Sequence, residues 1–526
     1  MPDRKPDRPS LILVTIDCLR ADHCGFLGYG VPTTPFLDRL AAQSFVFSNA
    51  IVAGVPTYYS FPAIMASRYP LALGREVLGL APGEINLASV LRDAGYNTAF
   101  FGAANPYLSP QFGYNFGFDT FRDFLQDHDL DHDDLPVHPS DSVLPPQIES
   151  HWKTRLNAAL ANLSHKIPAT GSAYDELYFR YCQRRSALQS PSFDLLRRFP
   201  AADVIVNQAE AWLSSIGDSP FFLWLHFMDP HAPYYPTEDA LKLLGNSQTA
   251  SRARYLNAFW NRSDLGSHRL HRHNKEMIAM YDAGIRWVDT QLARLVEVLR
   301  RSHRWENCIF TVTADHGEEF LDHDGRYHAP SLSEELIHVP LLIRVPGVAE
   351  PGDKKKNIRR DPFSLLHLAP TLLAAANAPI PGDFQGTNYW PNLQQENAWP
   401  SPPPAIAECV ADSTNPFRTG QSLGFRQLAI REPRYKLILT FNQENKILSE
   451  SLFDLEADPA ERHPLHNSAN RADRRRLLQA ALEHLRSSHP LRGSDAHLRM
   501  RLRGITRKLT DASQTLNEKF TPAVMM

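Results

Sequence analysis

The chain has 526 residues, of which 43% are hydrophobic, so it is long enough to bury a large core. Its formal net charge of −3 argues against a whole-protein electrostatic attraction to nucleic acid. Five scattered cysteines without a CxxC pair argue against a disulfide framework and against a zinc–thiolate site.

The N-terminal residues contain no apolar stretch of the signal-peptide kind. The first apolar run, Leu11–Ile16, is short and ends at Asp17, which predicts a buried strand. No segment approaches the roughly 20 apolar residues of a membrane-spanning helix. We therefore expect no membrane span and a cytoplasmic location.

Short apolar runs alternate with helical patterns along the chain. Helices are predicted at Leu87–Ala94 and at Lys275–Arg301, where apolar residues recur at helical spacing. Five runs lack period-2 alternation, which is typical of parallel strands buried on both faces: Leu11–Ile16, Asn97–Phe101, Phe221–His226, Cys308–Thr313 and Val339–Val345. This alternation predicts an α/β fold with a mostly parallel central sheet.

Residues 1–400 are predicted to form this α/β domain, with a helical insertion near 125–200. Within the insertion, Asp127–Pro146 is rich in Asp, His and Pro, and a solvated linker is favoured there over a metal site. The proline-rich segment after Ala398 marks a boundary. Residues 401–490 are expected to add a small antiparallel sheet and a helix, and 491–526 a tail.

The C-terminal part is dense in arginine between Arg471 and Lys508. A docking surface for a partner or an acidic substrate is one interpretation, and a solvated helix face is favoured over it. The arginines concerned are Arg471, Arg474, Arg475, Arg476, Arg499, Arg501 and Arg503.

Polar residues stand where three of the predicted strands end. Asp17 follows the first strand, Asp315 and His316 follow the fourth, and the third runs into the segment His226–His231. Functional groups in α/β sheets collect at the carboxyl ends of the strands. Carboxylates combined with imidazole suit Mg²⁺, Ca²⁺, Mn²⁺ or Zn²⁺.

Thr57 is a candidate nucleophile, because helix-like residues follow it and a helix N-terminus attracts anions. Its segment alone favours a simpler interpretation, in which Thr57 is only the N-cap of that helix.

Taken together and in order, these segments resemble the sulfatase family of the alkaline phosphatase superfamily. The similarity is carried by LILVTIDCLRADHCG, PTYYSFPAIMASRYP, WLHFMDPHAPY, TVTADHGEE, HVPLLIRVPG and SLFDLEADPAER. The resemblance implies an alkaline-phosphatase-like sheet flanked by helices, with a small C-terminal antiparallel sheet subdomain.

Two departures from the family pattern affect the chemistry. Aligned on RYP, Thr57 stands where sulfatases carry the cysteine that is oxidised to formylglycine, and Phe61 stands at the position of the motif's arginine. Cys18 stands where many sulfatases have a second aspartate, so the predicted metal site has fewer carboxylate ligands. Other branches of the superfamily use threonine as the nucleophile, so catalysis is still expected.

The resemblance also implies roles for individual residues. The predicted catalytic residues are Thr57, His231 and His328, and the predicted substrate-binding residues are His226 and Asn105. The predicted ligands of one divalent metal ion (Ca, Mg, Mn or Zn) are Asp17, Thr57, Asp315 and His316.

We therefore predict a hydrolase of sulfate or phosphate esters. The alternatives are a phosphodiesterase or phosphonate monoester hydrolase, a phospho-group transferase, and a non-catalytic binding protein. The expected substrate is a small-molecule, glycan-type or lipid-type anionic ester, no nucleic acid partner is expected, and a homo-oligomer is left open.

Overall fold

The structure is a computed structural model. It describes residues 8–74, 77–125, 176–177, 179–181, 183–184, 192–328, 330–347, 357–394, 403–411, 424–442, 446–466 and 470–487. The chain divides into two compact units. The first comprises Met1–Leu130, Phe199–Met228 and Val288–Met526, and the second comprises Asp131–Arg198 and Asp229–Trp287. The domain boundaries expected near residues 400 and 490 stay a prediction.

A nine-stranded sheet forms the centre of the first unit, in the order β10-β2-β9-β6-β1-β5-β3-β4, with β11 also paired to β2. The apolar runs of the sequence become its buried strands, as expected when helices cover both faces. The strands are β1 (Ser10–Ile16), β2 (Phe45–Ile51), β3 (Asn97–Gly102), β4 (Thr120–Arg122), β5 (Phe221–Phe227), β6 (Cys308–Ala314), β9 (His338–Arg344), β10 (Ile358–Arg359) and β11 (Phe363–Ser364).

The predicted strands β1, β3, β5 and β6 pair in parallel: β1 lies between β5 and β6, and β3 lies beside β5. The short strand β4, which was not predicted, pairs parallel with β3. The prediction of a parallel strand at Val339–Val345 was wrong, because β9 pairs antiparallel with both β6 and β2. A parallel return requires a long crossover, usually a helix. Between β6 and β9 the structure places only the short helix α11 (Glu334–Ile337) and the hairpin of β7 (Glu319–Phe320) and β8 (Arg326–Tyr327).

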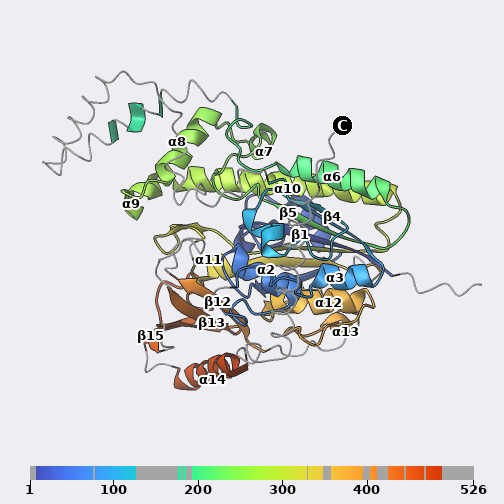
Figure 1. The fold of residues 1–526 in the computed structure, drawn as a ribbon. Helices are drawn as coiled ribbons and strands as arrows, with labels where there is room; N and C mark the ends of the chain where they lie inside the picture. Colours follow the sequence, from blue (N-terminus) through green and yellow to red (C-terminus); the bar gives the residue numbers. More distant parts are fainter. Residues whose placement is uncertain are drawn as a thin grey trace, which may run out of the picture. The chain divides into compact units, whose positions relative to one another are not determined.

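Helices cover both faces of this sheet. Figure 1 shows α6 above the central strands and α3 and α12 below them. The helices that lie within the first unit and outside its C-terminal part are α1 (Pro35–Ala41), α2 (Thr57–Ala66), α3 (Leu87–Asp93), α6 (Ala202–Ser215), α11, α12 (Leu368–Ala375) and α13 (Trp390–Gln394). This arrangement confirms the predicted fold class.

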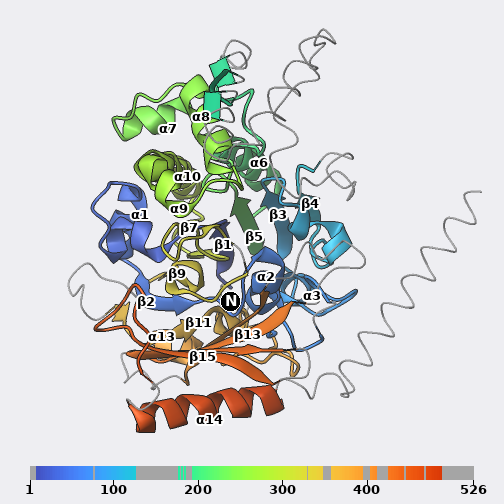
Figure 2. The same ribbon diagram turned by 90° about the vertical axis from the view of Figure 1, so that its left-hand side faces the viewer.

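A separate antiparallel sheet of four strands, in the order β12-β13-β14-β15, follows in the C-terminal part. Helix α14 (Arg471–Ser487) lies along one face of it (Figure 2). Leu477 and Ala481 of α14 pack on sheet residues that include Leu428, Leu437 and Leu452. The strands are β12 (Ala405–Ala411), β13 (Phe425–Arg431), β14 (Tyr435–Phe441) and β15 (Ile447–Asp454), as the sequence predicted for a small antiparallel sheet.

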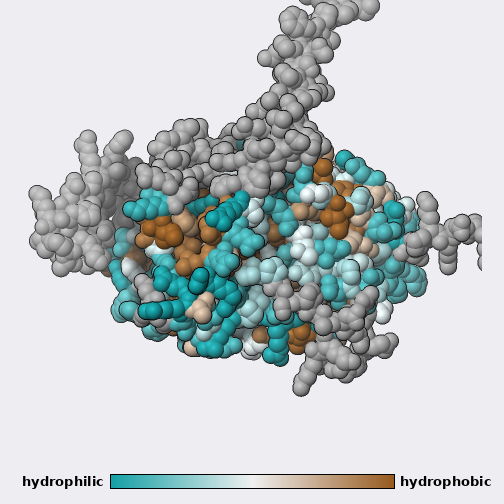
Figure 3. Space-filling model, turned by 90° about the horizontal axis from the view of Figure 1, so that it is seen from below, coloured by the Kyte–Doolittle hydropathy of each residue, from teal (hydrophilic) through white to brown (hydrophobic). Residues whose placement is uncertain are grey.

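The outer surface is mainly hydrophilic where it is seen from below, and hydrophobic residues gather there only in small separate groups (Figure 3).

The arginines of α14 contribute to ion pairs with their own sheet: Arg474 pairs with Glu450, and Arg476 pairs with Glu432. Arg499, Arg501 and Arg503 lie outside the described residues.

The second unit contains helices α7 (Glu238–Leu243), α8 (Ala250–Trp260) and α9 (Ser267–Leu270). The long helix α10 (Asn274–Arg301) begins in this unit, and its bounds match the predicted helix within one residue. Most of the insertion predicted near residues 125–200 lies outside the described residues. In the part of the chain that the structure describes, no helix has both the length and the apolar character that a bilayer span needs.

Candidate active site

The predicted metal-binding residues of two neighbouring strands lie at the same level of the sheet. Ile16 of β1 is paired in register with Ala314 of β6, so Asp17 and Asp315 leave the sheet side by side. Both carboxylates are fully buried. Burial and the charge of Asp17 raise the pKa of Asp315, since two adjacent buried carboxylates disfavour each other's ionisation.

Thr57 completes this group from a third element. It is the first residue of α2, and the N-cap is Pro56, so the interpretation of Thr57 as a mere N-cap is wrong. Its hydroxyl instead donates to Oδ2 of Asp315 at 2.9 Å and lies 3.1 Å from Nε2 of His316. The helix therefore carries the hydroxyl to the carboxyl end of β6.

His316 is held in one orientation by its own backbone neighbour. Its Nδ1 lies 2.9 Å from the carbonyl oxygen of Gly317. A carbonyl only accepts, so Nδ1 carries the proton and the lone pair of Nε2 faces the site. Nε2 is 3.4 Å from Asp315 Oδ2 and 3.9 Å from Asp17 Oδ1. This nitrogen is consequently available to a cation or to the Thr57 proton.

Asn105 and His226 lie against the Asp17 carboxylate. Asn105 Nδ2 donates to Asp17 Oδ2 at 2.8 Å, and Nε2 of His226 is 3.4 Å from the same oxygen. The side-chain oxygen of Asn105 accepts from the backbone N–H of Tyr107, which fixes the amide. His226 is fully buried, and its Nδ1 lies 2.9 Å from the Thr15 hydroxyl.

Aromatic packing closes the site behind His226. The ring of Phe61 lies edge-on to His226 at a centroid distance of 5.4 Å and contacts Trp224 at 5.3 Å. Trp224 in turn donates to the Thr15 hydroxyl at 2.9 Å. The residue at the position of the family's arginine is thus part of an apolar wall.

His328 reaches the same group from the strand that precedes it, β8. Its ring packs on His316 at a centroid distance of 4.5 Å. Its Nδ1 lies 3.3 Å from Glu318 Oε1 and 3.4 Å from the Cys18 sulfur. Burial by itself would lower the pKa of His328, but the negative charges of Glu318 and the two aspartates raise it to about 9.

The donor set fits a divalent cation. His316 Nε2 is the centre of the group: it lies 3.1 Å from the Thr57 hydroxyl, 3.4 Å from Asp315 Oδ2 and 3.9 Å from Asp17 Oδ1. Two carboxylates, one imidazole nitrogen and one hydroxyl are donors that divalent cations accept. Burying two carboxylates together is costly unless positive charge offsets them. The structure brings Asp17, Thr57, Asp315 and His316 together, and they are the residues that would hold the ion.

The structure does not test the placement of His231 in this group. His231 belongs to the second unit, where its Nδ1 contacts the carbonyl oxygen of Ala232. Its catalytic role stays a prediction.

Three contributors were not predicted. Thr15 lies within the apolar strand β1, and its hydroxyl was the only feature that could have indicated a role in the site. Glu318 lies two residues after His316, and its fully buried carboxylate contacts His328. Cys18 was counted as a lost ligand, although its sulfur lies 2.9 Å from Asp17 Oδ1.

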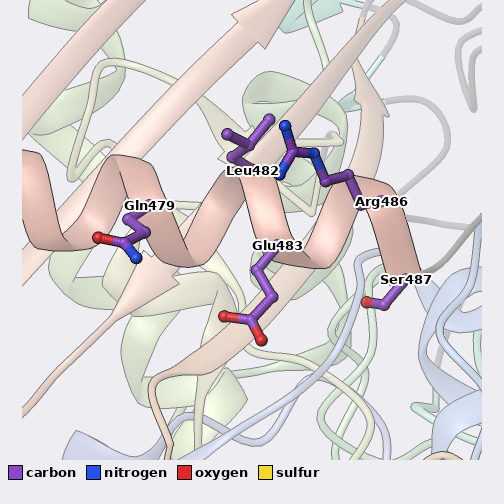
Figure 4. A pocket seen from close by; sticks show the side chains of 5 residues that line it. All are labelled: Gln479, Leu482, Glu483, Arg486 and Ser487. Atoms are coloured by element: carbon purple, nitrogen blue, oxygen red, sulfur yellow. The ribbon is translucent and has the colours of Figure 1, made fainter.

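A pocket of about 680 Å³ lies elsewhere, on helix α14 (Figure 4). Among the described residues its lining belongs to α14 and includes none of the predicted site residues: Gln479, Leu482, Glu483, Arg486 and Ser487. One helix face without converging acids, bases or nucleophiles offers no catalytic arrangement.

Comparison with known proteins identifies the family. Residues 9–378 match the sulfatase family. The chain belongs to the sulfatase family. Residues 322–488 also match the C-terminal domain of N-sulphoglucosamine sulphohydrolase. The family assignment confirms the predicted resemblance and the prediction of an ester hydrolase, and sulfatases generally use a divalent metal ion.

Curated relatives of this sulfatase-family chain share about a quarter of its residues. An ulvan-active sulfatase of Formosa agariphila is 23% identical over 479 residues, covering 88% of this chain and 78% of that protein. An arylsulfatase of Clostridium perfringens is 24% identical over 511 residues, covering 90% of this chain and 95% of that protein.

Solved structures with the same fold are less similar in sequence. A Bacteroides thetaiotaomicron protein of glycosaminoglycan metabolism superposes with a TM-score of 0.65 at 18% identity, covering 93% of this chain and 98% of that one. The phosphonate monoester hydrolase of Agrobacterium radiobacter superposes with a TM-score of 0.61 at 20% identity, covering 92% of this chain and 96% of that one. At this identity the likeness concerns the fold.

Proposed function

We propose that this sulfatase-family chain is a metal-dependent hydrolase of sulfate or phosphate esters in which Thr57 is the nucleophile. The observation that carries the proposal is the position of the Thr57 hydroxyl, 2.9 Å from Asp315 Oδ2 and 3.1 Å from His316 Nε2. A hydroxyl beside a carboxylate, an imidazole and a cation-binding donor set is an activated oxygen nucleophile.

In the proposed reaction, Thr57 Oγ1 forms a bond to sulfur or phosphorus while the bond to the ester oxygen of the alcohol breaks. The hydroxyl proton passes to the Asp315 carboxylate, whose Oδ2 accepts the hydrogen bond of the hydroxyl at 2.9 Å. Water then cleaves the Thr57 ester and restores the hydroxyl. A divalent cation, when bound, lowers the hydroxyl pKa and offsets charge on the non-bridging oxygens.

The departing alcohol oxygen requires a proton donor. His328 is our candidate, because its ring packs on the ring of His316, which lies beside the Thr57 hydroxyl. Asn105 and His226 contact Oδ2 of Asp17, whereas His316 faces Oδ1, so we assign Asn105 and His226 first to positioning the Asp17 carboxylate. His231 is proposed, from the family resemblance, to hold the anionic group of the substrate.

A second candidate is a phosphodiesterase or phosphonate monoester hydrolase. Phe61 and Asn105 stand at or near positions where the family carries cationic residues, and Phe61 packs against His226 and Trp224. Less positive charge in the site favours a singly charged ester over a doubly charged phosphate monoester. The likeness to a phosphonate monoester hydrolase agrees with this alternative. Transfer of the phospho-group from Thr57 to another acceptor is a variant of the same chemistry.

The organic part of the substrate is proposed to be a glycan or another small anionic ester, because the relatives named above include an ulvan-active sulfatase and an arylsulfatase. The cytoplasmic location also stays a proposal.

An activity panel tests the proposed function. Purified protein would be assayed with an aryl sulfate, a phosphate monoester, a phosphodiester and a phosphonate monoester, each with Ca²⁺, Mg²⁺, Mn²⁺ or Zn²⁺. We expect turnover of at least one ester, dependent on the added metal and lost in Thr57→Ala. Wild-type rates in a fully metallated Thr57→Ala protein would overturn Thr57 as the nucleophile.

A further inference from the structure

We propose that the Cys18 thiolate is a further protein ligand of the cation, and that this sulfur makes the site prefer zinc over calcium and magnesium. The inference rests on the proposed function, because it concerns the same cation. It replaces the expectation that Cys18 only removes a ligand, and it revises the argument from cysteine spacing against a zinc–thiolate site.

The geometry of the donor atoms carries the proposal. One ligand atom from each of Asp17, Cys18 and His316 lies within 4.8 Å of the other two, and all three residues are buried. The Cys18 sulfur is 2.9 Å from Asp17 Oδ1, which is itself 3.9 Å from His316 Nε2. Tetrahedral ligands that bind zinc at about 2.0–2.3 Å stand roughly 3.3–3.8 Å apart, so only small movements are needed.

The backbone places the sulfur on the same side as the Asp17 carboxylate. Successive side chains of an extended strand point to opposite faces, which would separate the two groups. Cys18 instead has φ of 60°, in the left-handed region that non-glycine residues rarely adopt. Its backbone N–H also points to Asp315 Oδ1 at 3.4 Å, so the turn that follows β1 is tied to the end of β6.

A buried anionic oxygen beside the group also favours a cation. Oε2 of Glu318 is buried and has no hydrogen-bond partner among the described residues. Oε1 of the same carboxylate is 3.3 Å from His328, whose Nδ1 is 3.4 Å from the Cys18 sulfur. An unpaired buried carboxylate oxygen is costly, and a divalent ion nearby reduces that cost.

The chemistry of the donors decides which ion is preferred. Calcium and magnesium take oxygen ligands, whereas zinc binds thiolate, imidazole and carboxylate together. The thiol loses its proton to solvent as the metal–sulfur bond forms, so the sulfur contributes one negative charge. A set of Cys18, His316, Asp17 and Asp315 is therefore a zinc-type set.

Cobalt and zinc binding test the proposal without an activity assay. Co²⁺ added to the metal-free protein should give the near-ultraviolet sulfur-to-cobalt charge-transfer band, and Cys18→Ser should lose it. Zinc affinity, measured by competition with a chromophoric chelator, should fall more than about 100-fold in Cys18→Ser, beyond the effect of an outer-shell change. Cys18→Asp should shift the preference towards calcium and magnesium.

Cys24 provides the matched control, since it is also buried in the turn after β1 and its thiol donates to Arg20 O. Cys24→Ser should keep the band and the zinc affinity. A cobalt complex without the sulfur band in the wild-type protein, or unchanged zinc affinity in Cys18→Ser, overturns the proposal. If Asp17→Asn still abolishes metal binding in that case, the proposed metal-dependent function survives. If the wild-type protein binds no cation, the proposed function and the Cys18 ligand both fail.

Discussion

Thr57 and Asp315 are 258 positions apart in the chain, yet the Thr57 hydroxyl donates to the Asp315 carboxylate at 2.9 Å. One residue begins α2 and the other follows β6, so this hydrogen bond joins a helix N-terminus to a strand end. The pairing places the proposed nucleophile beside the carboxylate that would accept its proton. The first prediction tests this relationship.

Thr57→Ala should lower turnover by at least about 1000-fold, because the attacking oxygen is removed. The free energy of unfolding should change by only about 1 kcal/mol, since one hydrogen bond is lost and no helix cap is affected. Steady-state kinetics with metal content determined on the same sample measure the effect. Thr57→Ser should keep appreciable activity because the hydroxyl persists.

Ser60→Ala is the matched control for Thr57→Ala. Ser60 lies one turn further along α2, is fully buried, and its hydroxyl has no hydrogen-bond partner among the described residues. Its removal should leave turnover near the wild-type value. Equal losses in both variants would show that the helix, and not the Thr57 hydroxyl, is responsible.

Asp17→Asn should abolish the stabilisation that a bound cation gives to the folded protein. A ligand that binds only the folded state stabilises it by about 2.7 kcal/mol at 100 times its Kd. The melting temperature of the wild-type protein should therefore fall after chelation and recover when the metal is restored. Asp22→Asn changes a more exposed aspartate nearby in the chain, which pairs with Arg20, and should keep this response.

Phe61→Ala should destabilise the fold by about 3–5 kcal/mol, because it opens a cavity against His226 and Trp224. Phe61→Leu should cost less, since most of the apolar volume remains. Denaturant unfolding of both variants measures the difference. A Phe61→Ala protein as stable as the wild type would contradict the apolar wall described here.

Glu408→Gln should destabilise the protein at neutral pH, by about 3–5 kcal/mol if the buried pairs are fully broken. Glu408 is fully buried and contacts Arg426 and His484, and it accepts from the backbone N–H of Leu71 at 3.1 Å. Burial by itself would raise the pKa of Glu408, but the charges of Arg426 and His484 lower it to about 2.

The pH dependence of this effect has a definite sign. A carboxyl whose pKa falls from 4.5 to about 2 on folding stabilises the protein fully above pH 4.5. That contribution is lost as the pH falls towards 2. The difference in free energy of unfolding between the wild-type protein and Glu408→Gln should therefore become smaller at low pH. Glu432→Gln, which removes a more exposed pair with Arg476, should cost less than about 1 kcal/mol at any pH.

Charge reversal on α14 should leave the turnover of small substrates unchanged. Arg474 and Arg476 pair with Glu450 and Glu432 of the C-terminal part of the chain. Arg474→Glu and Arg476→Glu should each lower the free energy of unfolding by about 0.2–1 kcal/mol. A large loss of turnover in either correctly folded variant would instead connect this helix with the active site.

The class of fold followed from the sequence pattern, because the apolar runs and the helical spacing reflect which faces are buried. The sequence pattern located β1, β3, β5 and β6 to within a residue or two, and it singled out Asp17, Asp315 and His316 as residues that follow strands. It could not tell the direction of β9, since a strand buried on both faces has the same composition in a parallel or an antiparallel pairing.

Only the tertiary structure decided which polar groups meet. Whether Thr57 caps its helix or faces Asp315 depends on where α2 docks, and that is set by contacts between residues far apart in the chain. The same holds for Cys18, which looked like a missing ligand until its left-handed backbone brought the sulfur beside Asp17. Local sequence reports burial and propensity, whereas a site is made by side chains from separate elements that converge only when the chain is folded.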